Sequence, residues 1–240
     1  MKTVIIIPSR MASIRYPNKP MVKIKGIPMV QRVWKQAIKA DIGDVFVACS
    51  EEEVFDLITS IGGKAVLTNP DLPSGTDRVY AAYNLIDQNN EYENIINLQG
   101  DMPMIDPKDI RSACIPLKHG FNIGTIATNI TQNEERNPNI TKVKINWRDS
   151  DFLGNCIDFY KLSRGELNNV YQHVGIYSFK PQTLKKFISL PISKNEIDRK
   201  LEQLRALDAG INIGITFVEN VPISIDTKED LIKIENIIKE

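Results

Sequence analysis

The sequence predicts an α/β protein with a mainly parallel sheet, helices on both faces of that sheet, and a β-rich section in the second half. Over the first 100 residues, short β-branched runs alternate with helical patterns, an order that produces a parallel sheet covered by helices. After about Gly120 the alternation stops and strand-like runs follow one another. The length of 240 residues suits one domain of this class. We therefore expect a single domain over 1–240, with its β-rich section at about 121–180.

The first half contains four strand patterns and three helix patterns. Each strand pattern is a run rich in Val, Ile or Ala, and each helix pattern has apolar residues at a period near 3.6. Ser50 and Glu53 match a capping box for the helix that follows the second strand. The expected strands are 3–7, 44–49, 64–68 and 94–98, and the expected helices are 27–38, one that follows Ser50, and 76–87.

The second half contains further strand patterns and three helix patterns. Between two of the strands, the stretch 149–169 is rich in Asp, Ser, Gly and Asn, which predicts irregular structure. The expected strands are 123–130, 142–147, 174–179 and 213–218, and the expected helices are 181–189, 196–209 and 227–239.

Composition excludes several protein classes. Lys and Arg together number 30, and so do Asp and Glu, so the formal net charge is 0. This balance argues against a protein that coats nucleic acid or an anionic membrane. The three scattered cysteines form no CxxC pair, which suits a reducing compartment and indicates no zinc site. The chain shows neither a signal-peptide pattern nor an apolar run of about 20 residues, so we expect a cytoplasmic protein with no membrane or nucleic-acid partner.

The first loop carries three cations and no glycine. Arg10, Arg15 and Lys19 follow the first strand within ten residues. Arginine offers a planar fork for phosphate oxygens and lysine a mobile point charge, so both suit a triphosphate. A solvated basic loop accounts for the same spacing.

Two carboxylates stand where strand patterns end. Asp101 follows Leu98, Gln99 and Gly100, and Asp226 follows an apolar run that precedes the last helix. Ligands of parallel sheets gather at the carboxyl ends of the strands. Carboxylate oxygens suit Mg²⁺, which usually takes one or two of them together with phosphates and water. The alternatives are an ordinary turn for Asp101 and a helix cap at Asp226 or Thr227.

Weaker signals lie elsewhere. Ser74 and Gly75 precede a helix and can approach a nucleobase or phosphate closely, although a plain N-cap explains them too. A charge on the helix surface is an alternative interpretation of Arg78. His173 sits on a strand, and the Glu202-Gln203 pair sits on an amphipathic helix. The sequence contains no G-x-S-x-G, H-E-x-x-H or G-x-G-x-x-G motif, so the cations, strand-end carboxylates and hydroxyl–glycine turn together favour nucleotidyl transfer.

Several ordered motifs resemble the 3-deoxy-manno-octulosonate cytidylyltransferase family. They are IIPSR-x-ASIR-x-P-x-KP, PSGTDR, NLQGDMP, HVGIYSF, LEQLRAL and VPISIDTKEDL, and they span nearly the whole chain. The resemblance implies a nucleotide-diphospho-sugar transferase (Rossmann-like) fold, Mg²⁺ as cofactor, and a homodimer formed by the β-rich section. It also implies transfer of a cytidylyl group from CTP to 3-deoxy-D-manno-octulosonate (Kdo) for lipopolysaccharide biosynthesis.

The resemblance also implies a role for particular residues. Arg10, Lys19 and Asp101 would be catalytic, with Asp101 and Asp226 holding Mg²⁺. The nucleotide-binding residues would be Arg10, Lys19, Ser74, Gly75, Arg78 and Gln99. The sugar-binding residues would be His173, Tyr177, Glu202, Gln203 and Lys161.

One segment departs from the family pattern. The family shows a Tyr-Phe-Ser-Arg-x-x-Ile-Pro segment, whereas residues 158–164 read DFYKLSR. Either Lys161 replaces the arginine expected near the sugar carboxylate, or Arg164 reaches it from a shifted register; lysine lacks the bidentate fork of arginine. The same chemistry on sialic acid or 8-amino-Kdo is therefore an alternative. A catalytically silent nucleotide-binding protein on the same fold is another.

Overall fold

A computed structural model describes residues 2–12, 16–148, 152–162 and 169–238, and the chain divides into two compact units. Unit 1 consists of Met1–Ile110 and Pro222–Glu240, and unit 2 consists of Arg111–Val221. The short helix α4 (Pro107–Ser112) contains the boundary between them.

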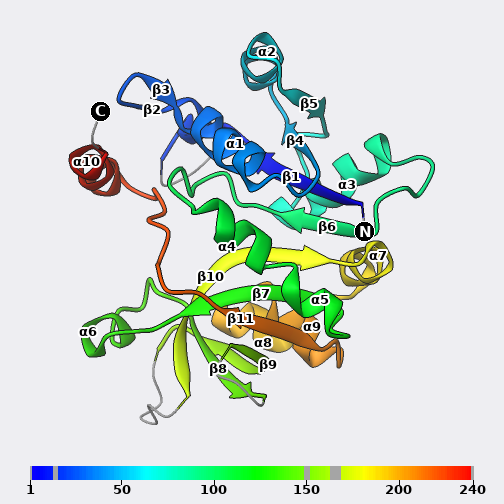
Figure 1. The fold of residues 1–240 in the computed structure, drawn as a ribbon, viewed down its shortest axis with the longest axis vertical. Coiled ribbons are helices and arrows are strands. Elements are labelled where there is room, and N and C mark those ends of the chain that lie inside the picture. The colour runs from blue at the N-terminus through cyan, green and yellow to red at the C-terminus, as the bar shows by residue number, and fades with distance from the viewer. Residues whose placement is uncertain (1, 13–15, 149–151, 163–168, 239–240) are drawn as a thin grey trace. The chain divides into compact units, whose positions relative to one another are not determined.

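Unit 1 contains four parallel strands in the order β5-β4-β1-β6 (Figure 1). The residues at the middle of β1, from Val4 to Ile7, are fully buried, as a strand covered on both faces requires. Because all four strands run in one direction, their carboxyl ends share one edge of the sheet, where the loops after β1, β4 and β6 begin. The strands are β1 (Thr3–Ser9), β4 (Asp44–Cys49), β5 (Lys64–Leu67) and β6 (Asn94–Asn97).

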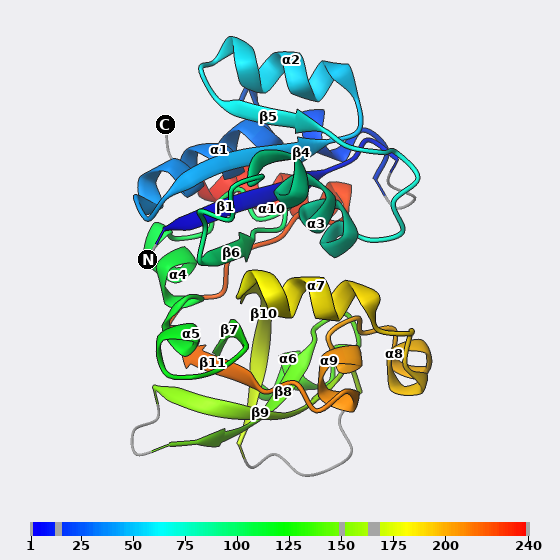
Figure 2. The same ribbon diagram turned by 90° about the vertical axis from the view of Figure 1, so that its right-hand side faces the viewer.

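Helices cover both faces of these strands. Helices α1 and α3 lie on opposite faces (Figure 2), as right-handed crossovers on either side of β1 require. Ser74 is the N-cap residue of α3, and its hydroxyl accepts the Asp77 N–H. The remaining elements of unit 1 are η1 (Lys19–Met21), β2 (Lys23–Ile24), β3 (Ile27–Pro28), α1 (Met29–Ala40), α2 (Glu52–Ser60), α3 (Gly75–Ile86) and α10 (Lys228–Ile237).

Among the described residues of unit 2, five strands have pairings that form a closed ring. The order is β10-β7-β11-β9-β8, and β8 pairs again with β10. Strand β10 closes the ring because its start at Val170–Gln172 pairs with β8, whereas the rest of it pairs with β7 across an irregularity between Val174 and Tyr177. Such irregularities bend a strand, as closure requires. The strands are β7 (Ile123–Thr128), β8 (Lys142–Trp147), β9 (Leu153–Tyr160), β10 (Val170–Phe179) and β11 (Ile213–Phe217).

Of the helices described in unit 2, α7 is the longest and the others are short. Helix α7 has the bounds that its apolar period predicts, with Pro181 in its first turn. The helices are α5 (Ile115–Lys118), α6 (Gln132–Glu135), α7 (Pro181–Ser189), α8 (Lys194–Arg199) and α9 (Leu204–Asp208).

The parallel strands and flanking helices predicted for the first half are confirmed, but three local predictions are wrong. The stretch 149–169 contains a strand, β9. Gly154 in this strand packs closely against Ile145 of β8, since a Cβ on Gly154 would lie 2.5 Å from the Ile145 Cγ2. A glycine within a strand often marks such a close approach. The helix predicted at 196–209 is two helices separated by residues 200–203, where Lys200 has a left-handed φ of 54° and Glu202 and Gln203 lie in a turn instead of the predicted helix. Glu51, not Ser50, is the N-cap residue of α2, and the Ser50 hydroxyl donates to the Glu51 carboxylate.

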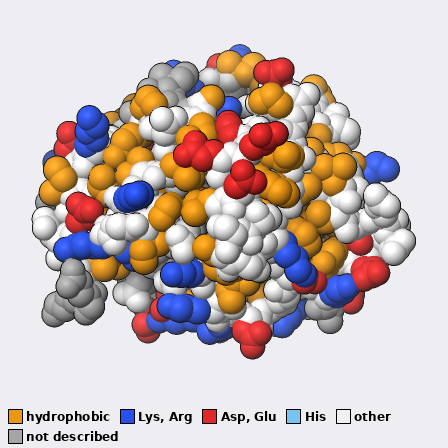
Figure 3. Space-filling view, turned by 90° about the horizontal axis from the view of Figure 1, so that it is seen from above, with side chains coloured by type: hydrophobic (Ala, Val, Ile, Leu, Met, Phe, Trp, Pro, Cys, Tyr) orange, Lys and Arg blue, Asp and Glu red, His pale blue; other side chains and the backbone are white. Residues whose placement is uncertain are grey.

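Within the described part of the chain, none of the helices has the length and apolar character needed to span a membrane. Acidic, basic and hydrophobic side chains share the face of the molecule shown in Figure 3.

Candidate active site

The central feature of unit 1 is one ammonium group between two carboxylates. The Lys19 Nζ donates to the Asp101 Oδ2 at 3.0 Å and to the Asp226 Oδ1 at 2.9 Å. The side chains of Lys19, Asp101 and Asp226 are 14%, 30% and 33% exposed, respectively, so solvent and small ligands can reach the carboxylates. Three of the four residues predicted to act on the triphosphate and metal, Lys19, Asp101 and Asp226, therefore meet at one place.

The loop after β1 is shaped to deliver Lys19 to this place. Asn18 adopts a left-handed conformation with φ of 56°, which asparagine tolerates better than most residues. The Asn18 N–H donates to the Met11 carbonyl at 3.1 Å, closing the loop back on itself. Pro20 is buried within η1, so the residue next to Lys19 is fixed by packing as well as by its ring.

Asp226 is held beside Asp101 by the backbone. The Ile225 N–H donates to the Asp101 carbonyl at 2.9 Å, and Ile225 is buried in a cluster with Ile24 and Met29. Packing of this side chain thus fixes the strand-end turn against the C-terminal segment. Thr227 caps α10 in a reciprocal capping box with Asp230, so the cap of this helix is Thr227 and not Asp226.

The two carboxylates fit a divalent cation of the magnesium type. Both offer hard oxygen atoms, and both approach the same cation, the Lys19 ammonium, within 3.0 Å. No group of three or more His, Cys, Asp or Glu residues that could hold a metal exists among the residues that the structure describes. A site with two carboxylates suits Mg²⁺, which completes its shell with phosphates and water, better than a metal that needs an all-protein cage.

Gln99 and Gly75 lie together, close to the end of β1. A Cβ on Gly75 would stand 3.6 Å from both the Gln99 Oε1 and the Pro8 Cγ. The Gln99 Nε2 donates to the Asn97 Oδ1 at 2.8 Å, which fixes the orientation of its amide. Ser74 caps α3 next to Gly75, so this part of the predicted nucleotide set is assembled and Ser74 has the capping role as well.

Arg78 is buried, with 1% of its surface exposed. Its guanidinium donates to the Thr68 hydroxyl at 2.6 Å and to the carbonyls of Asn69 and Pro70. The structure therefore contradicts the interpretation of Arg78 as a surface charge. The buried Arg78 side chain instead fixes the loop that leads to Ser74.

Arg10 is exposed directly after β1. It lies close enough to Arg78 for its charge to lower the pKa of that guanidinium, an effect secondary to burial. Arg15, the third cation of the first loop, lies outside the described residues.

Three of the predicted sugar-binding residues form one cluster in unit 2. The rings of His173 and Tyr177 have centroids 5.3 Å apart. Burial raises the pKa of the Tyr177 hydroxyl well above its usual value, and the charge of Glu202 raises it further. A tyrosine in this setting stays protonated and can donate a hydrogen bond to an anionic ligand. Gln203 stands at the start of α9.

The segment that departs from the family pattern has its own contacts. Arg199 donates to both Asp158 oxygens, at 2.6 and 2.9 Å, and to the Phe159 carbonyl. The buried Lys142 ammonium donates to the Lys161 carbonyl at 2.7 Å, which fixes the backbone at Lys161. Arg164 lies outside the described residues.

His173 gives a prediction for acid stability. Burial lowers its pKa to about 3 from 6.5, so the unfolded chain binds more protons than the native protein between these values. The free energy of unfolding should therefore fall as the pH drops below 6.5, by about 2 kcal/mol down to pH 5 from this group. We expect His173→Gln to remove that part of the loss, as measured by urea unfolding at the two pH values.

The control for this prediction is the other histidine. His119 is exposed after α5, so His119→Gln should change the pH dependence much less. An equal change in both variants would show that burial of His173 is not the cause.

Comparison with known proteins identifies the family. A family model described as cytidylyltransferase matches residues 4–213. A 3-deoxy-manno-octulosonate cytidylyltransferase of Paramagnetospirillum magneticum is 41% identical over 98% of this chain and 97% of its own length. The enzyme of the same name from Parvibaculum lavamentivorans is 43% identical over 95% of this chain and 90% of its own. This chain belongs to the 3-deoxy-manno-octulosonate cytidylyltransferase family.

Solved structures agree with this cytidylyltransferase assignment. A CMP:2-keto-3-deoxy-manno-octonic acid synthetase, solved in complex with CTP, has a TM-score of 0.90 and 33% identity, covering 99% of this chain and 98% of that one. A UDP-glucose pyrophosphorylase with bound UDP-glucose has a TM-score of 0.70 at 13% identity, covering 99% of this chain and 98% of that one, a likeness of fold alone. The chain is a nucleotidyltransferase with the fold predicted from its sequence.

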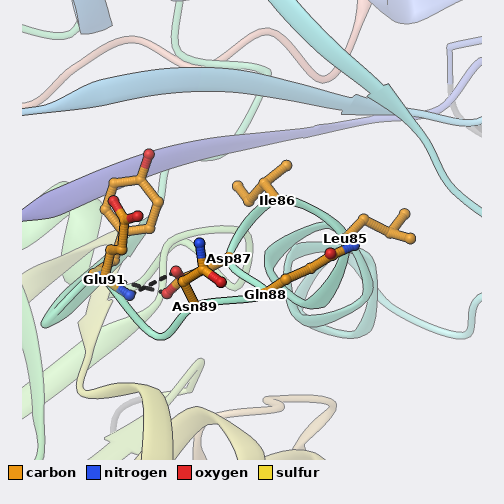
Figure 4. A pocket seen from close by; sticks show the side chains of 7 residues that line it. Leu85, Ile86, Asp87, Gln88, Asn89 and Glu91 are labelled. Carbon is orange, nitrogen blue, oxygen red and sulfur yellow. Dashed lines mark hydrogen bonds between the residues drawn. The ribbon is translucent and has the colours of Figure 1, made fainter.

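Two other features of the described part of the chain, a cavity and two buried thiols, do not form a second reaction centre. A cavity of about 220 Å³ follows the C-terminal end of α3 (Figure 4). It is polar, and its Asp87 carboxylate accepts the N–H groups of Glu91 and Tyr92, so this carboxylate closes a loop. Burial raises the pKa of Cys49 to about 11 and that of Cys114 to about 12, so neither thiol suits nucleophilic catalysis at neutral pH.

Sequence reasoning missed two residues of the site. Asn97 orients Gln99 and also donates from its Nδ2 to the Thr76 Oγ1 at 3.4 Å. A polar residue between Ile96 and Leu98 in a buried strand was the available signal. Glu51, which contacts the first loop through Met11, gave no signal because two more glutamates follow it.

Proposed function

We propose that this chain transfers a cytidylyl group from CTP to 3-deoxy-D-manno-octulosonate, forming the CMP-sugar and releasing pyrophosphate. The observation that carries the proposal is the convergence of the Asp101 and Asp226 carboxylates on the Lys19 ammonium, each within 3.0 Å of it. Relatives about 40% identical over nearly the whole chain bear the name of this activity.

Asp101 and Asp226 would hold Mg²⁺. Bound there, the metal would lower the pKa of the attacking hydroxyl and stabilise charge on the α-phosphate. Arg10 and Lys19 would bind the phosphates and neutralise the departing pyrophosphate. Gln99, Gly75 and Ser74 would contact the nucleotide, with Arg78 fixing the loop beside them.

The acid sugar would be bound by a second set of residues. The anomeric 2-hydroxyl would attack the α-phosphorus in line, a reaction that positioning and electrostatics suffice to catalyse. Tyr177 would donate a hydrogen bond to the sugar, supported by its raised pKa. The other proposed sugar contacts are His173, Glu202, Gln203 and Lys161.

The assembly and the cellular setting are part of the same proposal. We expect a homodimer through the β-rich section, where Phe152 and Leu162 are 47% and 66% exposed and would gain by burial. We expect the enzyme to work in the cytoplasm and its product to serve lipopolysaccharide biosynthesis, as the family resemblance implies.

Another acid sugar is the second candidate. Residues 158–164 depart from the family pattern, and Asp158 in this segment pairs with Arg199. A departure in this segment favours another acceptor such as sialic acid or 8-amino-Kdo. Lys161 would then meet the sugar carboxylate as a point charge.

The test is pyrophosphate release from CTP with a panel of ulosonic acids, with and without Mg²⁺. We expect turnover with 3-deoxy-D-manno-octulosonate and none without the metal. Turnover only with another acid would replace the acceptor and keep the chemistry. No turnover with any acid, from a folded protein that binds CTP, would favour a silent nucleotide-binding protein.

A further inference from the structure

The loop that carries the phosphate-binding cations is tied to a neighbouring strand end at one point. The Met11 N–H donates to the Glu51 Oε1 at 3.1 Å. Glu51 stands between β4 and α2, and β4 pairs with β1 so that Ser9 and Cys49 are register partners. The contact therefore joins the segments that leave two adjacent strands at the same edge of the sheet.

Met11 passes this restraint to both predicted phosphate ligands. Arg10 is its neighbour in sequence, and the Met11 carbonyl accepts the N–H of Asn18 at 3.1 Å. Asn18 in turn precedes Lys19 and accepts the Met21 N–H at 2.9 Å. A shift of Met11 would therefore displace the backbone at Arg10 and at Lys19 together.

The Glu51 carboxylate is not placed for stability alone. Its Oε1 also accepts the Ser50 hydroxyl at 2.8 Å, whereas its Oε2 is buried without a hydrogen-bond partner among the residues that the structure describes. A buried unsatisfied oxygen is destabilising. The charge of Glu51 also lies near the Arg78 guanidinium and raises its pKa, against the stronger effect of burial.

We propose that Glu51 is a positioning residue for CTP binding, which holds Arg10 and Lys19 in their binding geometry through the Met11 amide. This inference rests on the proposed function. A carboxylate near the phosphate-binding cations repels a triphosphate, so removal of its charge alone should strengthen CTP binding. Removal of the acceptor should weaken it. The two effects have opposite signs, which separates positioning from simple charge.

The experiment compares three variants by calorimetric titration with CTP in the presence of Mg²⁺. Glu51→Ala removes both charge and acceptor, and we expect the Kd to rise about 10-fold or more, as for loss of a hydrogen bond to a charged group. Glu51→Gln keeps an acceptor for the Met11 N–H, and its Kd should stay equal or fall. The matched control is Glu53→Ala, an exposed glutamate in the first turn of α2, for which no rise is expected.

Hydrogen exchange at the Met11 amide provides a readout that does not depend on catalysis. Its protection should drop about 10-fold in Glu51→Ala and stay within about 3-fold of the unaltered protein in Glu51→Gln. If Glu51→Ala does not fold, Glu51→Met, which fills similar space without an oxygen, takes its place.

Unchanged CTP affinity in Glu51→Ala, or an equal loss in Glu53→Ala, would overturn the inference. So would a loss of Met11 protection in Glu51→Gln as large as in Glu51→Ala. Failure of the unaltered chain to bind CTP would instead contradict the proposed function. Hydrogen exchange at the Met11 amide would still report whether its hydrogen bond to Glu51 exists.

Discussion

Asp101→Asn is expected to lower kcat by about 10²–10³-fold. The substitution keeps the size of the side chain but replaces a charged oxygen with an amide, at the position where Asp101 and Asp226 share the Lys19 ammonium. The proposed metal would lose one of its two protein ligands. Pyrophosphate release under saturating CTP and sugar measures the effect, and Asp226→Asn should behave alike.

A matched control separates this effect from a general loss of charge. Asp41 is exposed and left-handed at the end of α1, with φ of 50°, a conformation that asparagine accepts. Asp41→Asn should keep full turnover. Full turnover by a normally folded Asp101→Asn variant would refute the assignment of Asp101 to the metal and to catalysis.

Lys19→Met is the second substitution with a large expected effect. Lys19 neutralises two carboxylates and is also a proposed ligand of the pyrophosphate. Its loss removes both interactions, so we expect kcat/KM for CTP to fall by about 10²–10³-fold. Lys19→Arg keeps the charge and should retain part of the activity. Steady-state kinetics with CTP varied at fixed Mg²⁺ provides the measurement.

Thermal unfolding tests the same residue without catalysis. In Lys19→Met, Asp101 and Asp226 face each other without the ammonium, so added Mg²⁺ should raise the Tm more than it does in the unaltered protein. Lys23→Met, which removes an exposed lysine from β2, should show the Mg²⁺ response of the unaltered protein. A smaller response in Lys19→Met than in that control would mean that the two carboxylates do not form a cation site.

Local sequence patterns predicted the strands and helices whose formation depends mainly on residues close in the sequence. The first strand, the strand at Asp44–Cys49 and the helix at Pro181–Ser189 follow from β-branched runs and an apolar helical period. The caps at Ser74 and Thr227 follow from hydroxyl side chains ahead of helices. Local patterns failed at β9, where Gly154 looks like a turn residue but serves close packing against Ile145.

The sequence by itself determined that this protein is an α/β nucleotidyltransferase, and which cations and carboxylates were available to it. The sequence was sufficient for this because strand ends, helix caps and charged loops each depend on a few residues that are close together in the chain. Only the tertiary structure decided that Lys19 meets Asp226, 207 positions away, and that Glu51 restrains Met11. Those contacts depend on the burial of Ile225 and on the pairing of β1 with β4, and no local pattern records which distant segments pack together.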